Sequence, residues 1–232
     1  MPQKETVKKM FNEISGRYDF LNHFLSLGID RLWRKRLVRE MIQGKPEHVL
    51  DLATGTADLA IELLGQSQIR ITGVDISEKM LAVGKEKIAK AGLSSSIDLI
   101  SGDAENLQFS DKTFDAAMIA FGVRNFENLD KGISEMKRVL TKNGKVMILE
   151  FSHPASFPIK QVYGVYSRFI IPLMGRLISS HPSAYRYLPE TVAAFPSGEA
   201  FLNIMQQAGF KDCRRISLSG GIASIYIGTK PD

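Results

Sequence analysis

The sequence contains a single cysteine, Cys213, in 232 residues. One cysteine excludes an internal disulfide, a cysteine-based zinc site and a cysteine-ligated cluster, and it fits a reducing compartment. Long apolar runs are also missing: the most apolar stretch, Phe169 to Ile178, is interrupted by Pro172 and Arg176 and is too short to span a bilayer. The first residues, MPQKETVKKMF, are charged where a secretory signal has an apolar segment. We therefore expect a cytoplasmic protein that is soluble or peripheral on the inner face of the membrane.

The chain has no strong excess of charge of either sign. A net charge of +5 with 44% hydrophobic residues indicates one globular domain with a sizeable core. A mildly basic surface suits nucleic acid or an anionic membrane, or it serves solubility alone. We expect no nucleic-acid partner, because the sequence has no Asn-Pro-Pro-Tyr-type catalytic loop and no basic and aromatic run beyond Arg31 to Arg39.

The glycine-rich dinucleotide fingerprint, GxGxxG, is reduced to one glycine. The stretch VLDLATGTADLA, Val49 to Ala60, predicts a buried strand, a turn of small residues and a helix that starts near Asp58. Within the turn, Gly55 is flanked by Ala53 and Ala57. A strand, a small-residue loop and a helix start still present backbone N–H groups to a polar ligand. The alternative is an ordinary strand–turn–helix without a ligand.

Two further acids follow predicted strands. The strand Ile69 to Asp75 ends about 20 residues beyond the loop, where a carboxylate accepts hydrogen bonds from ribose hydroxyls. The next strand, Ile97 to Ser101, is followed by Asp103 and Ala104, where a carboxylate accepts a bond from an adenine amino group and a small side chain leaves room for the ring. These positions predict a nucleoside-containing cofactor. The missing pyrophosphate cradle favours S-adenosyl-L-methionine over a nicotinamide dinucleotide.

Strands and helices alternate from Glu47 onward, which indicates a Rossmann-like α/β fold with a parallel, doubly wound sheet. The last two strands, Arg214 to Leu218 and Ala223 to Gly228, are linked by so few residues that we expect an antiparallel hairpin. A seven-stranded sheet with such a hairpin is typical of class I S-adenosylmethionine-dependent methyltransferases. The other elements expected are strands at Phe114 to Phe121 and Lys145 to Phe151, and helices from the Ser77 cap to Ala91, at Leu129 to Leu140 and at Phe201 to Ala208.

Residues 1–45 are expected to form an N-terminal helical cap on a single domain that spans residues 1–232. Apolar residues at helical spacing predict a helix at Lys4 to Ile14 and two amphipathic helices joined at Ser26-Leu27-Gly28. The basic residues between Arg31 and Arg39 suit a solvated helix face. The alternative is a lid whose aromatic residues close over a substrate.

Six segments of the chain carry motifs of one known family: Arg17 to Arg34, Asp51 to Ala60, Gly73 to Leu81, Gly102 to Phe109, Phe121 to Ser152 and Tyr185 to Pro196. Through them the chain resembles the ubiquinone/menaquinone biosynthesis C-methyltransferases, the UbiE/MenG family, nearly from end to end. That resemblance implies S-adenosyl-L-methionine as cofactor, with Thr56, Asp75, Asp103 and Ala104 as its contacts, and we add Asp51 and Gly55 of the loop. One departure is Ala120, where some relatives carry a serine that contacts the cofactor.

The resemblance also implies methyl transfer to a ring carbon of a polyprenylated quinol. General similarity favours demethylmenaquinol, the precursor of menaquinol. The alternatives are 2-methoxy-6-polyprenyl-1,4-benzoquinol of the ubiquinone pathway and a different small molecule methylated by the same fold.

A quinol ring carbon becomes nucleophilic when the neighbouring hydroxyl ionises, so the site must handle a phenolic proton. Arg124, in the FGVRN motif, is the main candidate, because its guanidinium stabilises a phenolate and positions a water molecule. Asn125 is expected to orient the ring. The alternative for Arg124 is a structural ion pair with a nearby carboxylate. The second candidate base is His153, which follows the fifth strand, and its alternative is an exposed loop histidine.

Residues 152–196 form an apolar insertion after the fifth predicted strand. Residues such as Phe157, Ile159, Val162 and Tyr166 make it apolar, while Lys160 interrupts it with charge. We expect this insertion to line an apolar channel for the prenyl tail and to touch the bilayer. A second small core and a homodimer face are the alternatives.

Overall fold

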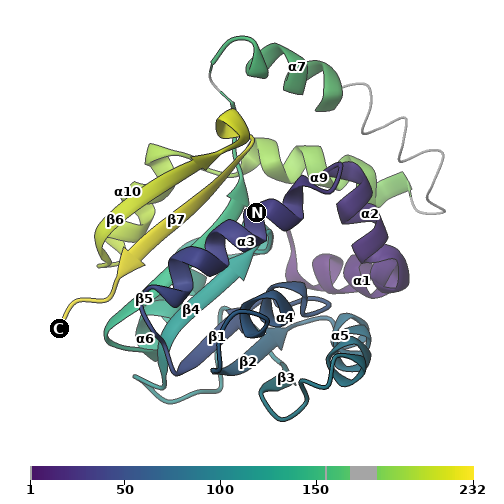
Figure 1. Ribbon diagram of the computed structural model, residues 1–232. Helices are drawn as coiled ribbons and strands as arrows, with labels where there is room; N and C mark the ends of the chain where they lie inside the picture. The colour runs from purple at the N-terminus through teal and green to yellow at the C-terminus, as the bar shows by residue number, and fades with distance from the viewer. Residues whose placement is uncertain (1, 155, 168–181) are drawn as a thin grey trace.

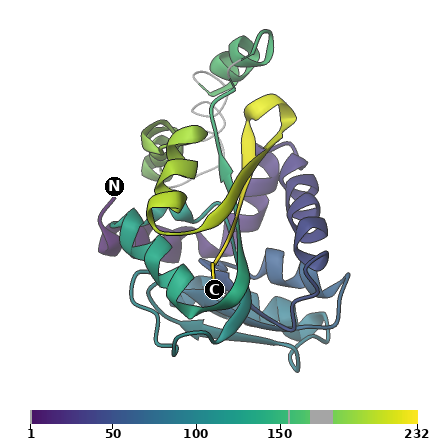
Figure 2. The same ribbon diagram turned by 90° about the vertical axis from the view of Figure 1, so that its left-hand side faces the viewer.

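The computed structural model describes residues 2–154, 156–167 and 182–232, with backbone alone for 182–186. A mixed sheet runs through the middle of the molecule and helices cover both of its faces (Figures 1 and 2). The strand order is β3-β2-β1-β4-β5-β7-β6. The strands are β1 His48–Leu52, β2 Arg70–Asp75, β3 Ile97–Ser101, β4 Phe114–Ala120, β5 Leu140–Phe151, β6 Lys211–Leu218 and β7 Ala223–Thr229.

Strands β1 to β5 pair in parallel, whereas β7 lies antiparallel between β5 and β6. The predicted seven-stranded sheet and its terminal hairpin are therefore confirmed. β1 lies between β2 and β4, so the chain reverses its winding direction at the β1/β4 pair. Ligands of open α/β sheets bind beyond the carboxyl ends of the strands at this reversal.

The helices form two layers with separate cores. One core joins α3, α4 and α5 to the sheet, and the other joins α6 and α10 to the opposite face. The predicted Ser77 cap is present, because its hydroxyl accepts the backbone N–H of Met80 at 3.2 Å. These helices are α4 Asp58–Leu64, α5 Glu78–Lys90, α6 Leu129–Val139 and α10 Glu199–Gln207.

The N-terminal cap consists of α1 Lys4–Ile14, the 3₁₀ turn η1 Ser15–Arg17, α2 Tyr18–Leu25 and α3 Ile29–Ile42. Gly28 joins α2 to α3 with φ of 74°, a left-handed conformation that glycine adopts without strain. Leu37 and Val38 of α3 are 0% exposed in the core shared with α4. The cap is thus a layer of the fold itself.

Two boundaries differ from the sequence-based prediction by three residues or more. β5 starts at Leu140 instead of Lys145, because Leu140 pairs with Phe114 before the register shifts at Ala116. β6 starts at Lys211 instead of Arg214 for a similar reason, since the pairing with β7 continues beyond a register shift. Bulged pairings of this kind leave no two-residue periodicity in the sequence.

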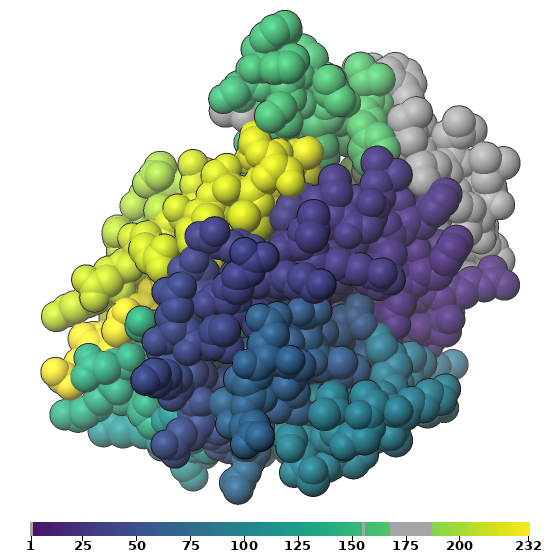
Figure 3. All heavy atoms as spheres, viewed as in Figure 1, coloured from purple at the N-terminus to yellow at the C-terminus, as the bar shows by residue number. Residues whose placement is uncertain are grey.

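The insertion 152–196 contains α7 Ile159–Val165 and α9 Pro182–Ala194. α7 protrudes above the C-terminal hairpin and is seen as a knob of green spheres in Figure 3. The hydroxyl of Tyr166, just after α7, donates to the backbone carbonyl of Leu25 in α2 at 2.7 Å. None of the helices in the described part of the chain combines the length and the hydropathy that a membrane-crossing helix requires.

The role of α3 as a structural layer is tested by truncating one of its core residues. Leu37→Ala is expected to lower the free energy of unfolding by about 2–5 kcal/mol in urea titrations, because it leaves a cavity under the helix. Leu32→Ala removes a leucine of the same helix that is 62% exposed, and it should change stability by less than about 0.5 kcal/mol. Equal effects of the two substitutions would contradict the assignment.

Candidate functional site

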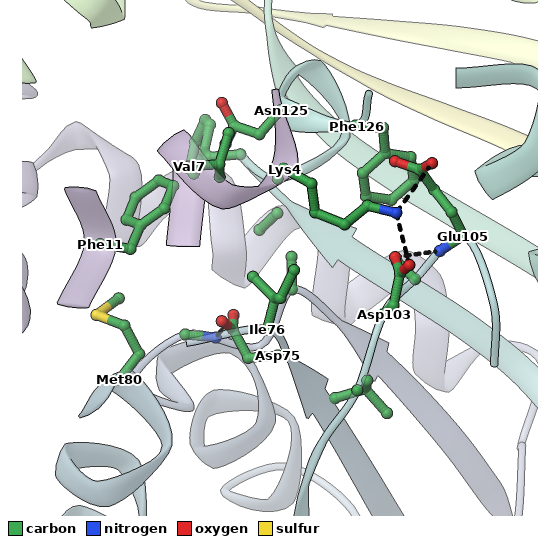
Figure 4. Close-up of a pocket in the computed structure, with 18 of the residues that line it drawn as sticks. Lys4, Val7, Phe11, Asp75, Ile76, Met80, Asp103, Glu105, Asn125 and Phe126 are labelled. Atoms are coloured by element: carbon green, nitrogen blue, oxygen red, sulfur yellow. Dashed lines mark hydrogen bonds and ion pairs between the residues drawn. The ribbon is translucent and has the colours of Figure 1, made fainter. Parts of the chain in front are cut away.

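A pocket of about 670 Å³ opens where the chain reverses at β1 and β4 (Figure 4). We call it the cofactor pocket. It combines carboxylates from the ends of β2 and β3 with apolar residues of α1. Its lining residues are Lys4, Val7, Phe11, Tyr18, Ala53, Gly55, Val74, Asp75, Ile76, Met80, Gly102, Asp103, Ala104, Glu105, Ala120, Phe121, Gly122, Asn125 and Phe126.

Asp75, at the end of β2, lines this pocket with a fixed orientation. Its Oδ2 accepts the backbone N–H of Gly55 at 2.8 Å, and its Oδ1 accepts that of Ser77 at 2.8 Å. Burial raises the pKa of Asp75 to about 6, although these backbone N–H groups oppose the shift. Each carboxylate oxygen has further lone pairs, so Asp75 can accept hydrogen bonds from a diol such as a ribose.

Asp103 and Ala104 also line the pocket, beyond β3. The Oδ1 of Asp103 accepts the backbone N–H of Glu105 at 2.9 Å, and its Oδ2 pairs with the Lys4 ammonium at 2.6 Å. The hydrogen bond to Asp103 is the largest cause of the raised pKa of Lys4. Lys4 belongs to α1, which therefore covers the pocket at this acid (Figure 4).

Alternate residues of the loop between β1 and α4 adopt the left-handed backbone conformation. Ala53, Gly55 and Ala57 have φ of 48°, 58° and 66°. These are the positions where glycine is expected, and alanine adopts this conformation only at an energetic cost. Gly55 lines the cofactor pocket, and an added Cβ would lie 3.3 Å from the Met80 side chain.

Asp51 and Thr56 lie beside the same loop but do not line the cofactor pocket. Asp51 is buried at the end of β1, where its Oδ2 accepts the hydroxyl of Thr54 at 2.6 Å. Burial raises the pKa of Asp51 to about 7. The hydroxyl of Thr56 donates to Asp19 of α2 at 2.5 Å. The structure therefore places Asp75, Asp103, Ala104 and Gly55 around one pocket, with Asp51 and Thr56 in an adjoining layer.

Arg124 lies in the short 3₁₀ turn η2 Val123–Asn125 that follows β4, behind the pocket wall. Its Nη1 pairs with Glu150 at 2.8 Å and donates to the carbonyl of Phe121 at 2.5 Å. Its Nε is buried and makes no hydrogen bond to any described residue. Arg124 thus forms the ion pair that the sequence left as the alternative, while retaining one unused donor.

Of the two other predicted catalytic residues, Asn125 lies at the cofactor pocket and His153 does not. Asn125 lines the cofactor pocket, and its Oδ1 accepts the hydroxyl of Tyr187 at 2.8 Å. Burial raises the pKa of Tyr187 to about 12, so this hydroxyl is a donor at neutral pH. His153 is exposed after β5, and it is not among the residues that line the cofactor pocket.

A larger apolar cavity of about 1480 Å³ lies above the cofactor pocket, under α7 and α9. Its wall is composed almost entirely of apolar and aromatic side chains. Its lining residues are Asn22, Leu25, Ser26, Leu27, Ile29, Trp33, Phe151, Pro158, Ile159, Val162, Tyr163, Tyr166, Ser167, Leu188, Pro189, Val192, Ser219 and Ile222. Residues of the predicted insertion thus contribute to the cavity together with α2 and α3 of the cap.

Three aromatic residues separate the two cavities, and we call them the aromatic wall. Phe121 lines the cofactor pocket, whereas Trp33 and Phe151 line the apolar cavity. The ring centroids of Phe121 and Phe151 are 4.6 Å apart, and Trp33 lies 6.1 Å from each. Phe121 has φ of 58°, an unusual conformation for a bulky residue, as expected at a functional site.

Some residues of the site could not be identified from the sequence. Lys4 approaches Asp103 from 99 positions away, and Arg34 enters a small cavity beside the loop from the cap. Glu150 could have been identified from the sequence, because an acid near the end of a buried strand must have a partner. In the structure this partner is Arg124.

The sequence of the chain matches the ubiE/COQ5 methyltransferase family over residues 1–230. Demethylmenaquinone methyltransferase from Bacteroides fragilis is 46% identical over 229 residues, which cover 98% of this chain and 94% of that protein. The ubiquinone/menaquinone biosynthesis C-methyltransferase UbiE from Citrifermentans bemidjiense is 43% identical over 228 residues, or 97% of each chain.

Solved structures agree with this match at the level of the fold. A SAM-dependent methyltransferase from Thermotoga maritima superposes with a TM-score of 0.68 at 20% identity, covering 96% of this chain and 99% of that one. Another, from Aquifex aeolicus, has a TM-score of 0.58 at 19% identity, covering 79% and 82%. A class I methyltransferase fold and a sequence match over almost the whole length lead to one conclusion: the chain belongs to the ubiE/COQ5 methyltransferase family.

Proposed function

We propose that the protein transfers a methyl group from S-adenosyl-L-methionine to a ring carbon of demethylmenaquinol, giving menaquinol. The observation that carries the proposal is the contact of two unlike cavities across the aromatic wall. One cavity has acids placed for a nucleoside, and the other is large and apolar enough for a prenylated ring. A relative that is 46% identical bears the name of this activity.

The residues of the cofactor pocket fit S-adenosyl-L-methionine. Asp75 has free lone pairs for a ribose, and Asp103 with Ala104 offers an acceptor and space for an adenine. Asp51, Gly55 and Thr56 are the proposed contacts for the amino-acid part. When bound, the cofactor supplies an electrophilic methyl group. Asp103, like Asp75, keeps lone pairs for a further hydrogen bond, and its ion pair with Lys4 places α1 beside the proposed adenine site.

Arg124 is the proposed positioning and charge-stabilising group for the quinol. Its guanidinium carbon lies 5.4 Å from the ring centroid of Phe151, which lines the apolar cavity, and its buried Nε donates to none of the described residues. A cation beside the ring pocket favours an ionised phenol, and ionisation makes the ring carbon nucleophilic. Asn125, held by Tyr187, is placed to orient the ring. His153 is the second candidate proton acceptor, although its exposed position separates it from both cavities.

The choice of quinol rests on relatives rather than on one residue. Two of the proteins named demethylmenaquinone methyltransferase, from Bacteroides fragilis and Porphyromonas gingivalis, are 46% and 44% identical to the chain. A relative named for both ubiquinone and menaquinone biosynthesis is 43% identical. We therefore place the methoxy-benzoquinol second, and a different small molecule third.

The proposed activity is tested with labelled S-adenosyl-L-methionine and the two quinols side by side. The wild-type protein should methylate demethylmenaquinol faster than the benzoquinol. Arg124→Ala should bind the cofactor with unchanged affinity by calorimetry but lose about 10²–10³ in kcat, because it removes a preorganised donor. Cofactor binding without methylation of either quinol would contradict the proposal.

A matched variant separates catalysis from structure. Glu150→Gln keeps the Arg124 guanidinium but removes the charge of its ion-pair partner, so kcat should fall far less than in Arg124→Ala. If both variants lose turnover and stability equally, Arg124 acts only as a structural ion pair.

The tail-binding role of the apolar cavity is tested by filling it. Leu188→Trp adds bulk to the cavity wall, so the KM for a long-tailed quinol should rise about tenfold while that for a tailless analogue stays unchanged. Val165→Trp is the control, since Val165 is 58% exposed on α7 and does not line the cavity. Equal effects on both substrates would show that the tail binds elsewhere.

We also propose that the mouth of the apolar cavity contacts the bilayer. Leu27 and Val162 at the cavity are 71% and 67% exposed, and Phe157 before α7 is 81% exposed. Flotation with anionic liposomes should carry the wild-type protein upward, and the double variant Phe157→Ser, Val162→Ser should float less. No association at low salt would contradict the bilayer contact. Sedimentation as a dimer that these substitutions dissociate would instead assign the face to a second copy.

A further inference from the structure

A small polar cavity adjoins the cofactor pocket beside the loop between β1 and α4. It spans about 330 Å³, including space open to solvent, and we call it the loop cavity. It shares Tyr18, Ala53, Gly55 and Ala120 with the cofactor pocket, so the two cavities lie side by side. The other residues that line the loop cavity are Arg34, Asp51, Thr54, Thr56, Asp58 and Leu59.

The loop cavity presents buried groups of both charges. Asp51, from the end of β1, is 1% exposed, and Arg34, from α3 of the cap, is 7% exposed. Burial raises the pKa of Asp51 to about 7, and the nearby Arg34 opposes that shift. Buried charges require partners. A cavity lined by the acids Asp51 and Asp58 and by the guanidinium of Arg34 suits a ligand end that carries both charges, as the zwitterion of an amino acid does.

Arg34 is held in place by groups on its far side. Asp30 accepts a hydrogen bond from Nη1 of Arg34, and Asp30 itself is held by the hydroxyl of Ser26 at 2.6 Å and by His23 at 2.8 Å. The Nη2 of Arg34 lies 3.7 Å from Asp58, which is too long for a hydrogen bond. A guanidinium has five N–H donors in a planar fork, so Arg34 retains donors for a further carboxylate.

The charges around the loop cavity match a ligand with a net positive charge. Lys87 pairs with Asp19 at 2.7 Å and with Asp58, and the hydroxyl of Thr56 donates to Asp19. The acids Asp19, Asp30, Asp51 and Asp58 therefore exceed the bases Arg34 and Lys87, with His23 beside Asp30. S-adenosyl-L-methionine carries a sulfonium and an ammonium against one carboxylate. Arg34 lines the loop cavity whereas Lys87 does not, so Arg34 is the cation within reach of that carboxylate.

We propose that Arg34 binds the α-carboxylate of the amino-acid end of the cofactor, with Asp51 opposite it for the α-ammonium. The inference rests on S-adenosyl-L-methionine as the proposed cofactor. It makes the N-terminal cap part of the cofactor site, because Arg34 comes from α3 whereas the nucleoside contacts come from β2 and β3. Asp30 is then the residue that positions the guanidinium.

Calorimetric titration with two ligands tests the role of Arg34 without measuring turnover. The ligands are S-adenosyl-L-methionine and its decarboxylated form, which lacks only the carboxylate. The wild-type protein should bind the intact cofactor about 10–100-fold more tightly, the range expected for a charged hydrogen-bonded pair. Arg34→Met should reduce this ratio to about one. Lys35→Met removes an exposed charge from the same helix and should keep the wild-type ratio.

The ratio of the two affinities separates the role of Arg34 from the identity of the cofactor. Equal binding of the two ligands by the wild-type protein, or a wild-type ratio in folded Arg34→Met, would overturn the role of Arg34 and leave the cofactor assignment intact. If neither ligand binds the wild-type protein, the proposed cofactor is wrong. Should Arg34→Met fail to fold, Arg34→Lys keeps the charge without the fork, and its ratio is expected to fall at least about threefold. An unchanged ratio in Arg34→Lys would then count against the inference.

Discussion

The Asp75 carboxylate fixes the geometry on which the rest of the site depends. By accepting the backbone N–H groups of both Gly55 and Ser77, it ties the loop after β1 to the start of α5. The loop then retains its left-handed turns at Ala53 and Ala57, in spite of their cost. Because both oxygens keep spare lone pairs, one side chain shapes the pocket and remains available to a ligand.

The fold could be predicted largely from the sequence, because its strongest signals are local. The apolar strand Phe114–Ala120 and the short link between β6 and β7 determine the parallel sheet and its antiparallel end. The positions of Asp75, Asp103 and Ala104 followed from the same logic, since parallel strands end at one edge. Contacts between distant segments could not be predicted: Lys4 reaches Asp103, and Arg34 reaches the loop, only after the cap has docked.

The aromatic wall connects the two halves of the proposed chemistry. Phe121 belongs to one cavity and Phe151 to the other, and their rings pack together at 4.6 Å. Guanidinium groups lie over both rings, with Arg34 5.7 Å from the Phe121 centroid and Arg124 5.4 Å from that of Phe151. The polar and the apolar cavity thus meet at the aromatic wall. A reaction between a charged donor and a lipid-like acceptor requires such a meeting point.

The positions of the covering helices carry a further consequence. α1 lies over the polar compartment, whereas α7 and α9 enclose the apolar one. The two compartments therefore lie beneath different helices. A movement of α1 can open the polar compartment without disturbing the helices that hold a ligand in the apolar one.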